Sequence, residues 1–279
     1  AAQRRHLARR RPSITWGMPS ANDLATHLAG LRHSLANTHE PENAWYSNRR
    51  RKALGSGITC ALTLIMVGLV AGRADELSVN PAADTFISSG HPGNNAGGHT
   101  HFAAGRDGTG GVRRGLVRFD VAAIPVGSTV TSVELRLRLT DVPAFGGVNS
   151  AFELYRLRAA WGEGTKVGNN GSVATAGEAT WTARFAGTDG WVAAGAMSDA
   201  AASASASALV GLTKGQVISW TGPGLVSDVQ SWVDNPAGNF GWLLASQAEE
   251  SARSARGFGS RESGANGGVL MVNYIPAVV

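Results

Sequence analysis

Residues 115–140, GLVRFDVAAIPVGSTVTSVELRLRLT, decide the fold class. In the second half of this stretch Val133, Leu135, Leu137 and Leu139 alternate with polar residues. A repeat of two residues places the apolar side chains on one face of a β-strand and the polar side chains on the other. The first half alternates in the same way before an Ile-Pro-Val-Gly break. The stretch therefore predicts two consecutive strands, each with one face on a hydrophobic core. On this register we expect Phe119 and Leu137 to be buried.

Short apolar runs bounded by Gly, Asn or Pro continue along the rest of the chain. Many turns and short strands are typical of an all-β protein, and we predict an antiparallel β-sandwich with one short helix. The strand candidates are 84–88, 101–104, 114–121, 130–140, 151–157, 178–183, 207–210, 215–220, 239–246, 254–260 and 268–274.

The predicted helix lies in TGPGLVSDVQSWVDNP, residues 221–236. Thr221 is the expected N-cap, and Pro223 suits the first turn. Apolar side chains then recur at helical spacing up to Trp232, and the Asn235-Pro236 pair ends the helix.

Residues 49–74 carry the pattern of a secretory signal peptide, with a basic cluster, an apolar run over 58–71 and small residues before Asp75. The run is shorter than the roughly 20 residues that span a bilayer, so we expect cleavage after Ala74. An uncleaved signal anchor is the alternative, because 53–72 is long enough to span. We interpret 75–279 as a single β-sandwich domain. Residues 1–48 are either an over-extended gene start or a disordered or partly helical leader.

The charge of the chain is unevenly distributed. Residues 1–52 hold ten Lys and Arg and three Asp and Glu, a net charge of +7, whereas residues 75–279 hold 14 and 17, a net charge of −3. The basic character therefore belongs to the leader, and we exclude nucleic acid as the expected partner. The segment 75–279 has no cysteine, so its core forms without disulfides.

Several motifs resemble one family of bacterial secreted modules. ADTFISSGHPGNNAGG (83–98) and RRGLVRFDVAAIPVGSTVTSVELRLRL (113–139) resemble its opening and central patterns. The later landmarks follow in order: YRLRAAWGEG, EATW, LVSDVQSWV, NFGWLLAS, GFGSRES and LMVNY. The chain is thus similar to DNRLRE domain proteins, which overlap with carbohydrate-binding module family 96. The resemblance implies a secreted, extracellular or cell-surface sandwich of jelly-roll type that binds carbohydrate.

Arginines gather near the opening stretch, where 113–158 holds seven arginines against four carboxylates. Arg118, Arg136 and Arg138 fall on the polar faces of their strands. A guanidinium group pairs well with carboxylates and sulfates, so we expect these three to help bind an anionic polysaccharide. The alternative is a solvated surface that only keeps the protein soluble.

Six tryptophans lie in 75–279, and a flat aromatic face can stack on a sugar ring. Trp232 and Trp242 stand in apolar patterns and are expected in the core. Trp191 is flanked by glycine on one side in AGTDGWVAAGA. We expect it to be exposed and to contact the ligand, with burial in the core as the alternative.

Metal sites have weaker support. Asp84, Asn94, Asn95 and Asp107 offer the hard oxygen atoms that a structural Ca²⁺ prefers, but no spaced Asp-x-Asp loop fixes it. His99-x-His101 places two rings on one face of a strand without a third ligand nearby. We expect no metal, with a structural Ca²⁺ as the alternative.

Catalytic motifs are not found. The sequence has no Gly-x-Ser-x-Gly elbow and no His-Glu-x-x-His pair, and its single cysteine, Cys60, lies in the apolar run of the signal. The sequence thus predicts a non-catalytic carbohydrate-binding protein without stable membrane insertion after cleavage. A structural or adhesive surface protein is the alternative. A polysaccharide-degrading enzyme with an unrecognised pair of carboxylates is a further one.

Overall fold

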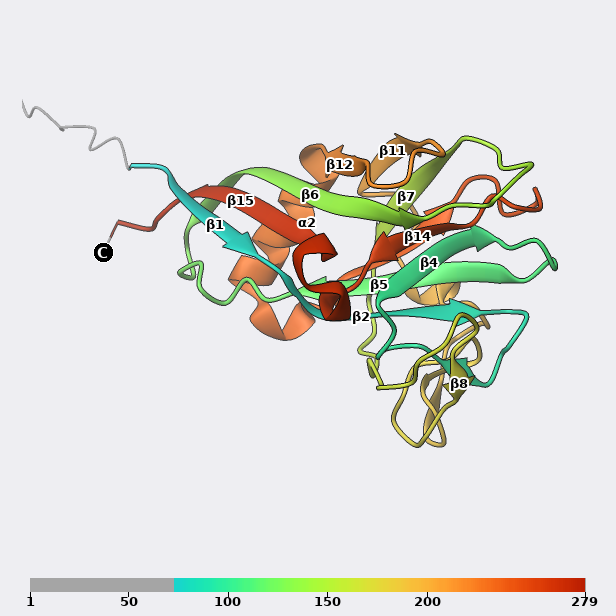
Figure 1. The fold of residues 1–279 in the computed structure, drawn as a ribbon. Helices are drawn as coiled ribbons and strands as arrows, with labels where there is room; N and C mark the ends of the chain where they lie inside the picture. The colour runs from blue at the N-terminus through green and yellow to red at the C-terminus, as the bar shows by residue number, and fades with distance from the viewer. Residues whose placement is uncertain (1–72, 279) are drawn as a thin grey trace, which may run out of the picture. The chain divides into compact units, whose positions relative to one another are not determined.

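The computed structural model describes residues 73–278 (Figure 1). The predicted leader and the body of the predicted signal peptide lie outside the described residues. Within them, no helix is long and apolar enough to cross a membrane.

The described residues form one large antiparallel sheet (Figure 1). Its strands run in the order β1-β15-β6-β14-β4-β5-β13-β7-β11, with β12 paired to β6 and β2 paired to β5. Their bounds are β1 (Asp75–Val79), β2 (Pro81–Ser88), β4 (His101–Arg106), β5 (Val112–Phe119), β6 (Thr129–Asp141), β7 (Ser150–Arg156), β11 (Ala206–Val210), β12 (Val217–Thr221), β13 (Trp242–Ser246), β14 (Arg256–Gly259) and β15 (Val269–Ile275).

Two small pairs of strands lie outside this sheet. They are β3 (Asn94–Asn95) with β8 (Ser172–Val173), and β9 (Ala183–Phe185) with β10 (Asp189–Gly190). The predicted strand at 178–183 is wrong, because all but the last of these residues belong to a loop that leads into β9. β1, which pairs with β15, was not predicted from the sequence.

The large sheet curls around one core. Strands β14 and β4 connect the half that contains β6 and β15 to the half that contains β5 and β13. Apolar side chains from both halves meet in one cluster that includes Phe119, Leu137 and Trp242. The all-β class and the antiparallel pairing are thus confirmed, whereas the strands form one continuous curled sheet rather than two separate sheets.

Strand β6 has the register that its sequence predicts. Val133, Leu135, Leu137 and Leu139 are buried, and each residue between them is exposed or half-buried. Phe119 on β5 is also fully buried. A shift of one residue would have moved the whole apolar set to the solvent face, so the register is confirmed.

The segment between β7 and β11 covers the opposite face of β5 and β13. Leu116 and Leu243 on these strands pack with Trp161 and Trp191 of the segment in a second apolar cluster. Leu116 is therefore buried, although its period places it on the polar face of its strand. Every residue of β13 is buried, because apolar clusters lie on both of its faces.

The helix is α2 (Pro223–Asp234), and its apolar side packs against β6. Leu225, Val229 and Trp232 are buried as predicted. The predicted N-cap is wrong, because Gly222 occupies that position and Thr221 is the last residue of β12. Gly222 has φ 141°, a backbone angle that favours glycine, and no side chain caps the helix.

Candidate functional site

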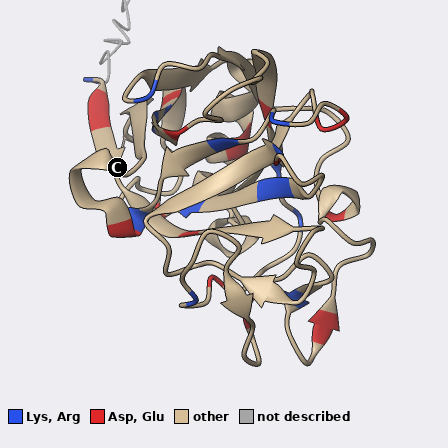
Figure 2. Cartoon of the chain, turned by 45° about the vertical axis from the view of Figure 1, so that its right-hand side comes forward, with Lys and Arg blue, Asp and Glu red and all other residues tan. Residues whose placement is uncertain are grey.

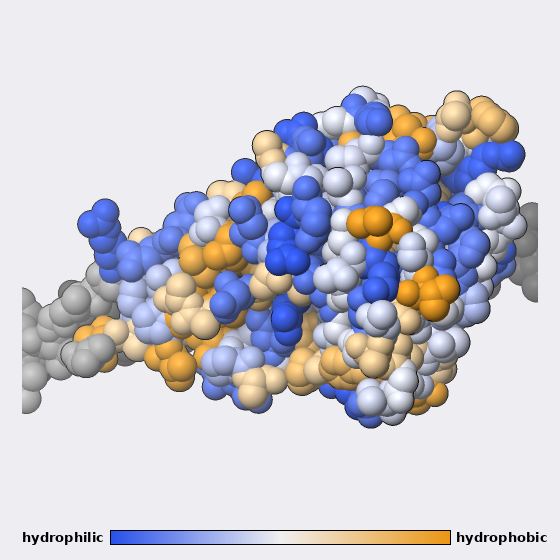
Figure 3. All heavy atoms as spheres, turned by 60° about the horizontal axis from the view of Figure 1, so that its bottom comes forward, coloured by the Kyte–Doolittle hydropathy of each residue, from blue (hydrophilic) through white to orange (hydrophobic). Residues whose placement is uncertain are grey.

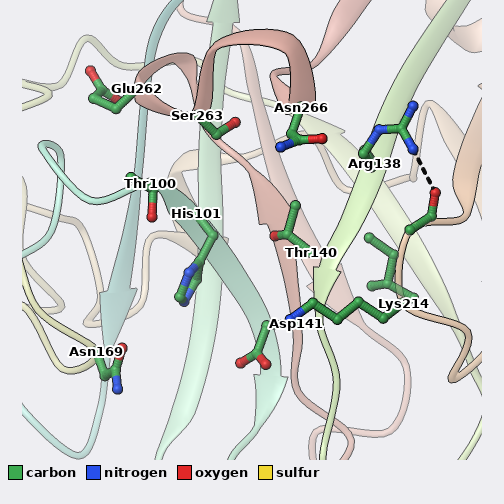
Figure 4. A pocket seen from close by; sticks show the side chains of 12 residues that line it. Thr100, His101, Arg138, Thr140, Asp141, Asn169, Lys214, Glu262, Ser263 and Asn266 are labelled. Carbon is green, nitrogen blue, oxygen red and sulfur yellow. Dashed lines mark hydrogen bonds between the residues drawn. The ribbon is translucent and has the colours of Figure 1, made fainter.

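An open groove with a volume of about 740 Å³ crosses the outer side of β4, β14 and β6 (Figure 4). The short helix η3 (Arg261–Asn266) forms one of its walls, and loops at 169 and 214–215 form others. Most of the lining side chains are polar: Thr100, His101, Arg138, Thr140, Asp141, Asn169, Lys214, Glu262, Ser263 and Asn266. Such a mixture of donors and acceptors suits a ligand with many hydroxyl groups.

Strand β14, which lies between β4 and β6, carries two glycines at which neighbouring segments approach closely. A Cβ atom at Gly257 would lie 2.7 Å from Cβ of Asp141 and 3.2 Å from Cδ2 of His101. At Gly259 a Cβ atom would collide with the carbonyl of Asn266 in η3. The two glycines therefore let β4, β6 and η3 approach β14 closely.

Two cations stand at one side of the groove. Arg138 donates from Nη1 to the carbonyl of Gly215 at 2.8 Å, and Lys214 precedes that glycine (Figure 4). Among residues 73–278, neither side chain has a carboxylate within ion-pair distance. Asp141 likewise has no cationic side chain within ion-pair distance among these residues. The carboxylate of Glu262, by contrast, lies 3.0 Å from the guanidinium of Arg261.

His101 is neutral at physiological pH. Burial, helped by the neighbouring His99, lowers its pKa to about 4, while Asp141 acts in the opposite direction. The rings of His99 and His101 meet edge to face with centroids 4.2 Å apart. His101 therefore offers the groove a neutral ring with both donor and acceptor capacity.

The three arginines predicted as one basic patch do not line one pocket. Arg138 lines the groove, and Arg136 lies two residues away on β6, where it pairs with Glu134 at 2.7 Å. Arg118 lies on β5, which β4 and β14 separate from β6 in the sheet, and it lines a different cavity of about 230 Å³. Figure 2 likewise shows Lys and Arg at several separate places on the chain. Of the three, only Arg138 reaches the groove.

The predicted exposure of Trp191 is wrong. Its side chain is 7% exposed and packs in the second apolar cluster. Its indole N–H donates to the carbonyl of Thr180 at 2.9 Å. Trp232 and Trp242 are buried as predicted.

The candidate calcium ligands point to separate partners. Asp84 accepts from the backbone N–H of Arg261, and Oδ1 of Asn95 accepts from that of Gly97. Asn94 donates to the carbonyl of Asn170, and Asp107 accepts from Thr109. Within residues 73–278, no group of three or more His, Cys, Asp or Glu side chains is arranged to hold a metal ion.

Sequence reasoning missed most of the groove. Asn169, Lys214, Ser263 and Asn266 come from loops or from η3 and follow no periodic pattern. GFGSRES was recognised only as a landmark, yet its Glu262 and Ser263 line the groove. The one usable signal was Gly257 and Gly259 inside a strand, because glycine there often marks the close approach of another backbone or a ligand.

Comparison with known families gives a match to carbohydrate-binding module family 96 over residues 75–205. The resemblance inferred from the motifs is therefore confirmed for this segment. The matched residues include Thr100, His101, Arg138, Asp141 and Asn169 of the groove. No curated protein matches the chain.

Proposed function

We propose that the chain is a secreted, non-catalytic carbohydrate-binding protein and that the groove over β4, β14 and β6 holds the glycan. The observation that carries this proposal is the family match, because the matched segment supplies β4, β6 and much of the groove lining. The family is one of binding modules, which supports a non-catalytic role. Secretion rests on the signal pattern of 49–74.

We infer that the favoured glycan is anionic. Asp107 pairs with Arg113 beside the groove, whereas the guanidinium of Arg261 is shared between Glu262 and Glu163. Arg138 and Lys214 then face the single unpaired carboxylate of Asp141. His101 adds no charge at neutral pH, because its pKa is about 4. Together with the cavity that adjoins it, the groove is lined by five Lys and Arg side chains against three carboxylates, and this excess of positive charge favours uronate or sulfate groups.

The common core of the two halves supports the jelly-roll-like sandwich that the resemblance implies. In this view β14 and β4 close one side of a sandwich, and the groove lies on the outside of that closure. The alternative of a structural protein without a ligand gains no specific support from the groove.

Affinity electrophoresis tests the proposal. The full chain is run in gels that contain alginate, pectate or a neutral β-glucan, at low and high salt. We expect retardation by the acidic polymers that weakens with salt, because exposed charges are screened over about 8 Å at physiological ionic strength. Arg138→Ala combined with Lys214→Ala should weaken binding by about 1–3 kcal/mol.

Arg136→Ala is the matched control, because Arg136 lies on the same strand, outside the groove. It should change retardation much less than Arg138→Ala. Equal losses from both would place binding on the polar face of β6 instead of in the groove. Equal retardation by the neutral polymer would overturn the anionic preference, and no retardation by any polymer would overturn carbohydrate binding. The appearance of new reducing ends when the protein is incubated with a polysaccharide would contradict the non-catalytic role.

A further inference from the structure

The groove continues beyond the region described above. A second cavity of about 250 Å³ shares His101, Asp141 and Asn169 with it. This extension runs past Asp107 and Gly108 on one side and past Val142 and Pro143 on the other. Arg253 also lines it. A chain-like ligand that leaves the groove along β14 would therefore pass Arg253.

Phe145 lies next to this extension, two residues after Pro143. Its side chain is 69% exposed, and it is the only aromatic residue among the large apolar side chains that are exposed in 73–278. The guanidinium carbon of Arg253 lies 4.5 Å from the centroid of its ring, so the cation covers one face. On the side of the molecule in Figure 3, apolar residues lie in separate groups among hydrophilic ones. Phe145 belongs to neither of the two apolar clusters of the core.

The backbone holds this pair in a fixed arrangement. Arg253 has φ 61°, in the left-handed region that non-glycine residues seldom adopt. Its amide donates to the carbonyl of Asp107 at 3.4 Å. Its side chain runs close to Gly108 and Gly146, where a Cβ atom would lie 3.8 Å and 3.5 Å from it. Strain of this kind is concentrated at sites where the position of a side chain matters.

Arg256 joins the two loops that carry the pair. Its Nη2 donates to the carbonyl of Val148 at 2.6 Å, in the loop that contains Phe145. Its Nη1 donates to the carbonyl of Arg253 at 3.5 Å. Arg256 is 1% exposed, so these bonds are shielded from water. The loops that carry Phe145 and Arg253 are therefore linked to each other by buried hydrogen bonds of Arg256.

We propose that Phe145 and Arg253 form an additional sugar subsite at the end of the groove. A pyranose ring stacks on the uncovered face of Phe145, and the guanidinium edge of Arg253 binds an acidic group of the sugar beside it. Apolar C–H faces of sugars and flat aromatic rings fit this contact, and the cation holds the ring in place. This inference rests on the proposed function, and it predicts that longer oligosaccharides bind more tightly than those that fill only the groove.

Calorimetric titration with uronate oligosaccharides of increasing length tests this subsite. The probes are disaccharides, tetrasaccharides and octasaccharides from alginate and pectate, and the proteins are the full chain and its variants. Phe145→Ala should weaken binding of the octasaccharide roughly three- to tenfold and leave the disaccharide unchanged. Phe145→Trp should retain or improve binding of the octasaccharide. Phe145→Leu keeps apolar bulk without a flat ring and should behave like the alanine variant.

Leu209→Ala is the matched control, because Leu209 is 71% exposed on β11 and lines neither cavity. It should leave the affinity for every length unchanged. Octasaccharide affinity that is the same for Phe145→Ala and the parent chain would overturn the subsite and leave the groove proposal standing. Absence of binding by the parent chain at every length would instead overturn the proposed function on which the subsite rests.

Discussion

Oδ2 of the buried side chain of Asp84 accepts a hydrogen bond from the backbone N–H of Arg261 at 2.7 Å. This contact ties β2 to the start of η3, the helix that forms one wall of the groove. Glu163 accepts from the amide of Asp84 at 2.8 Å and from the guanidinium of Arg261 at 2.9 Å. The wall is therefore held by carboxylates, one of which is almost completely buried.

We expect Asp84 to make the stability of the fold depend on pH. Burial raises the pKa of Asp84 from 3.8 to about 7, and the hydrogen bond from Arg261 opposes this only in part. As pH rises from about 4 to about 7, the unfolded chain loses a proton that the folded chain keeps, so the free energy of unfolding falls. Above about 7 both states are ionised and the effect is constant.

Asp84→Asn keeps an oxygen acceptor and cannot ionise. Between pH 5 and pH 8 its free energy of unfolding should fall less than that of the parent chain, by on the order of 2 kcal/mol. Urea unfolding at both pH values measures this difference. Asp120→Asn changes an exposed carboxylate and serves as the control. The same pH dependence in Asp84→Asn and the parent would show that Asp84 is not the group responsible.

Trp191→Phe separates a packing role from a binding role. The variant loses the hydrogen bond to Thr180 and part of the buried ring, so we expect a loss of about 1–2 kcal/mol of stability. Because the ring is buried away from the groove lining, its affinity for glycans should stay the same. Thermal unfolding and affinity electrophoresis measure the two quantities. A folded variant with weakened glycan binding would restore Trp191 as a ligand contact.

The contrast between Leu137 and Trp191 shows what the sequence specifies. Leu137 belongs to a long alternating strand, so its burial follows from the period alone. Trp191 lies in a loop without a period, and its burial depends on how the loop folds over Leu116 and Leu243, which are distant in sequence. The strands of the sheet were largely predictable because their alternating period appears in the sequence. The segment that covers β5 and β13 was not predictable, because its fold depends on contacts with residues distant in sequence.

The groove was unpredictable for a related reason. Arg138 was identified because it alternates with the buried residues of β6. Lys214 and Asn266 reach the same groove from a turn and from η3, and only the curled sheet brings those segments together. The separation of Arg118 from Arg138 has the same cause, because closeness in sequence does not determine the order of strands in a sheet.

Arg256 is expected to be essential for stability. Its Nε donates to the carbonyl of Gly211 at 2.7 Å and its Nη1 to that of Ala255 at 3.0 Å, in addition to the bond to Val148. Burial lowers its pKa, and no carboxylate pairs with it among the described residues. Arg256→Met leaves these carbonyls without donors and should cost about 2–5 kcal/mol in the free energy of unfolding.

Arg136→Met provides the comparison for Arg256→Met, because Arg136 is exposed and pairs only with Glu134. It should leave the stability nearly unchanged, because exposed ion pairs contribute little. Arg256→Lys keeps the charge but cannot span both loops with one ammonium group, so it should resemble the methionine variant. Urea unfolding ranks the three. Full stability of Arg256→Met would mean that the loops around Phe145 are held by other contacts.

Gly257→Ala gives the most direct test of the groove, because it adds a single methyl group against two residues that line it, Asp141 and His101. The new Cβ atom would lie 2.7 Å from Cβ of Asp141 and 3.2 Å from Cδ2 of His101, so both neighbours must move. We expect a loss of about 1–3 kcal/mol of stability from overpacking. Glycan affinity should fall as well, since the displaced side chains line both the groove and its extension.

Gly93→Ala is the matched control, because a Cβ atom there meets nothing within 4 Å. Urea unfolding and affinity electrophoresis are measured on both variants. Unchanged glycan binding by folded Gly257→Ala would mean that the glycan binds elsewhere on the molecule.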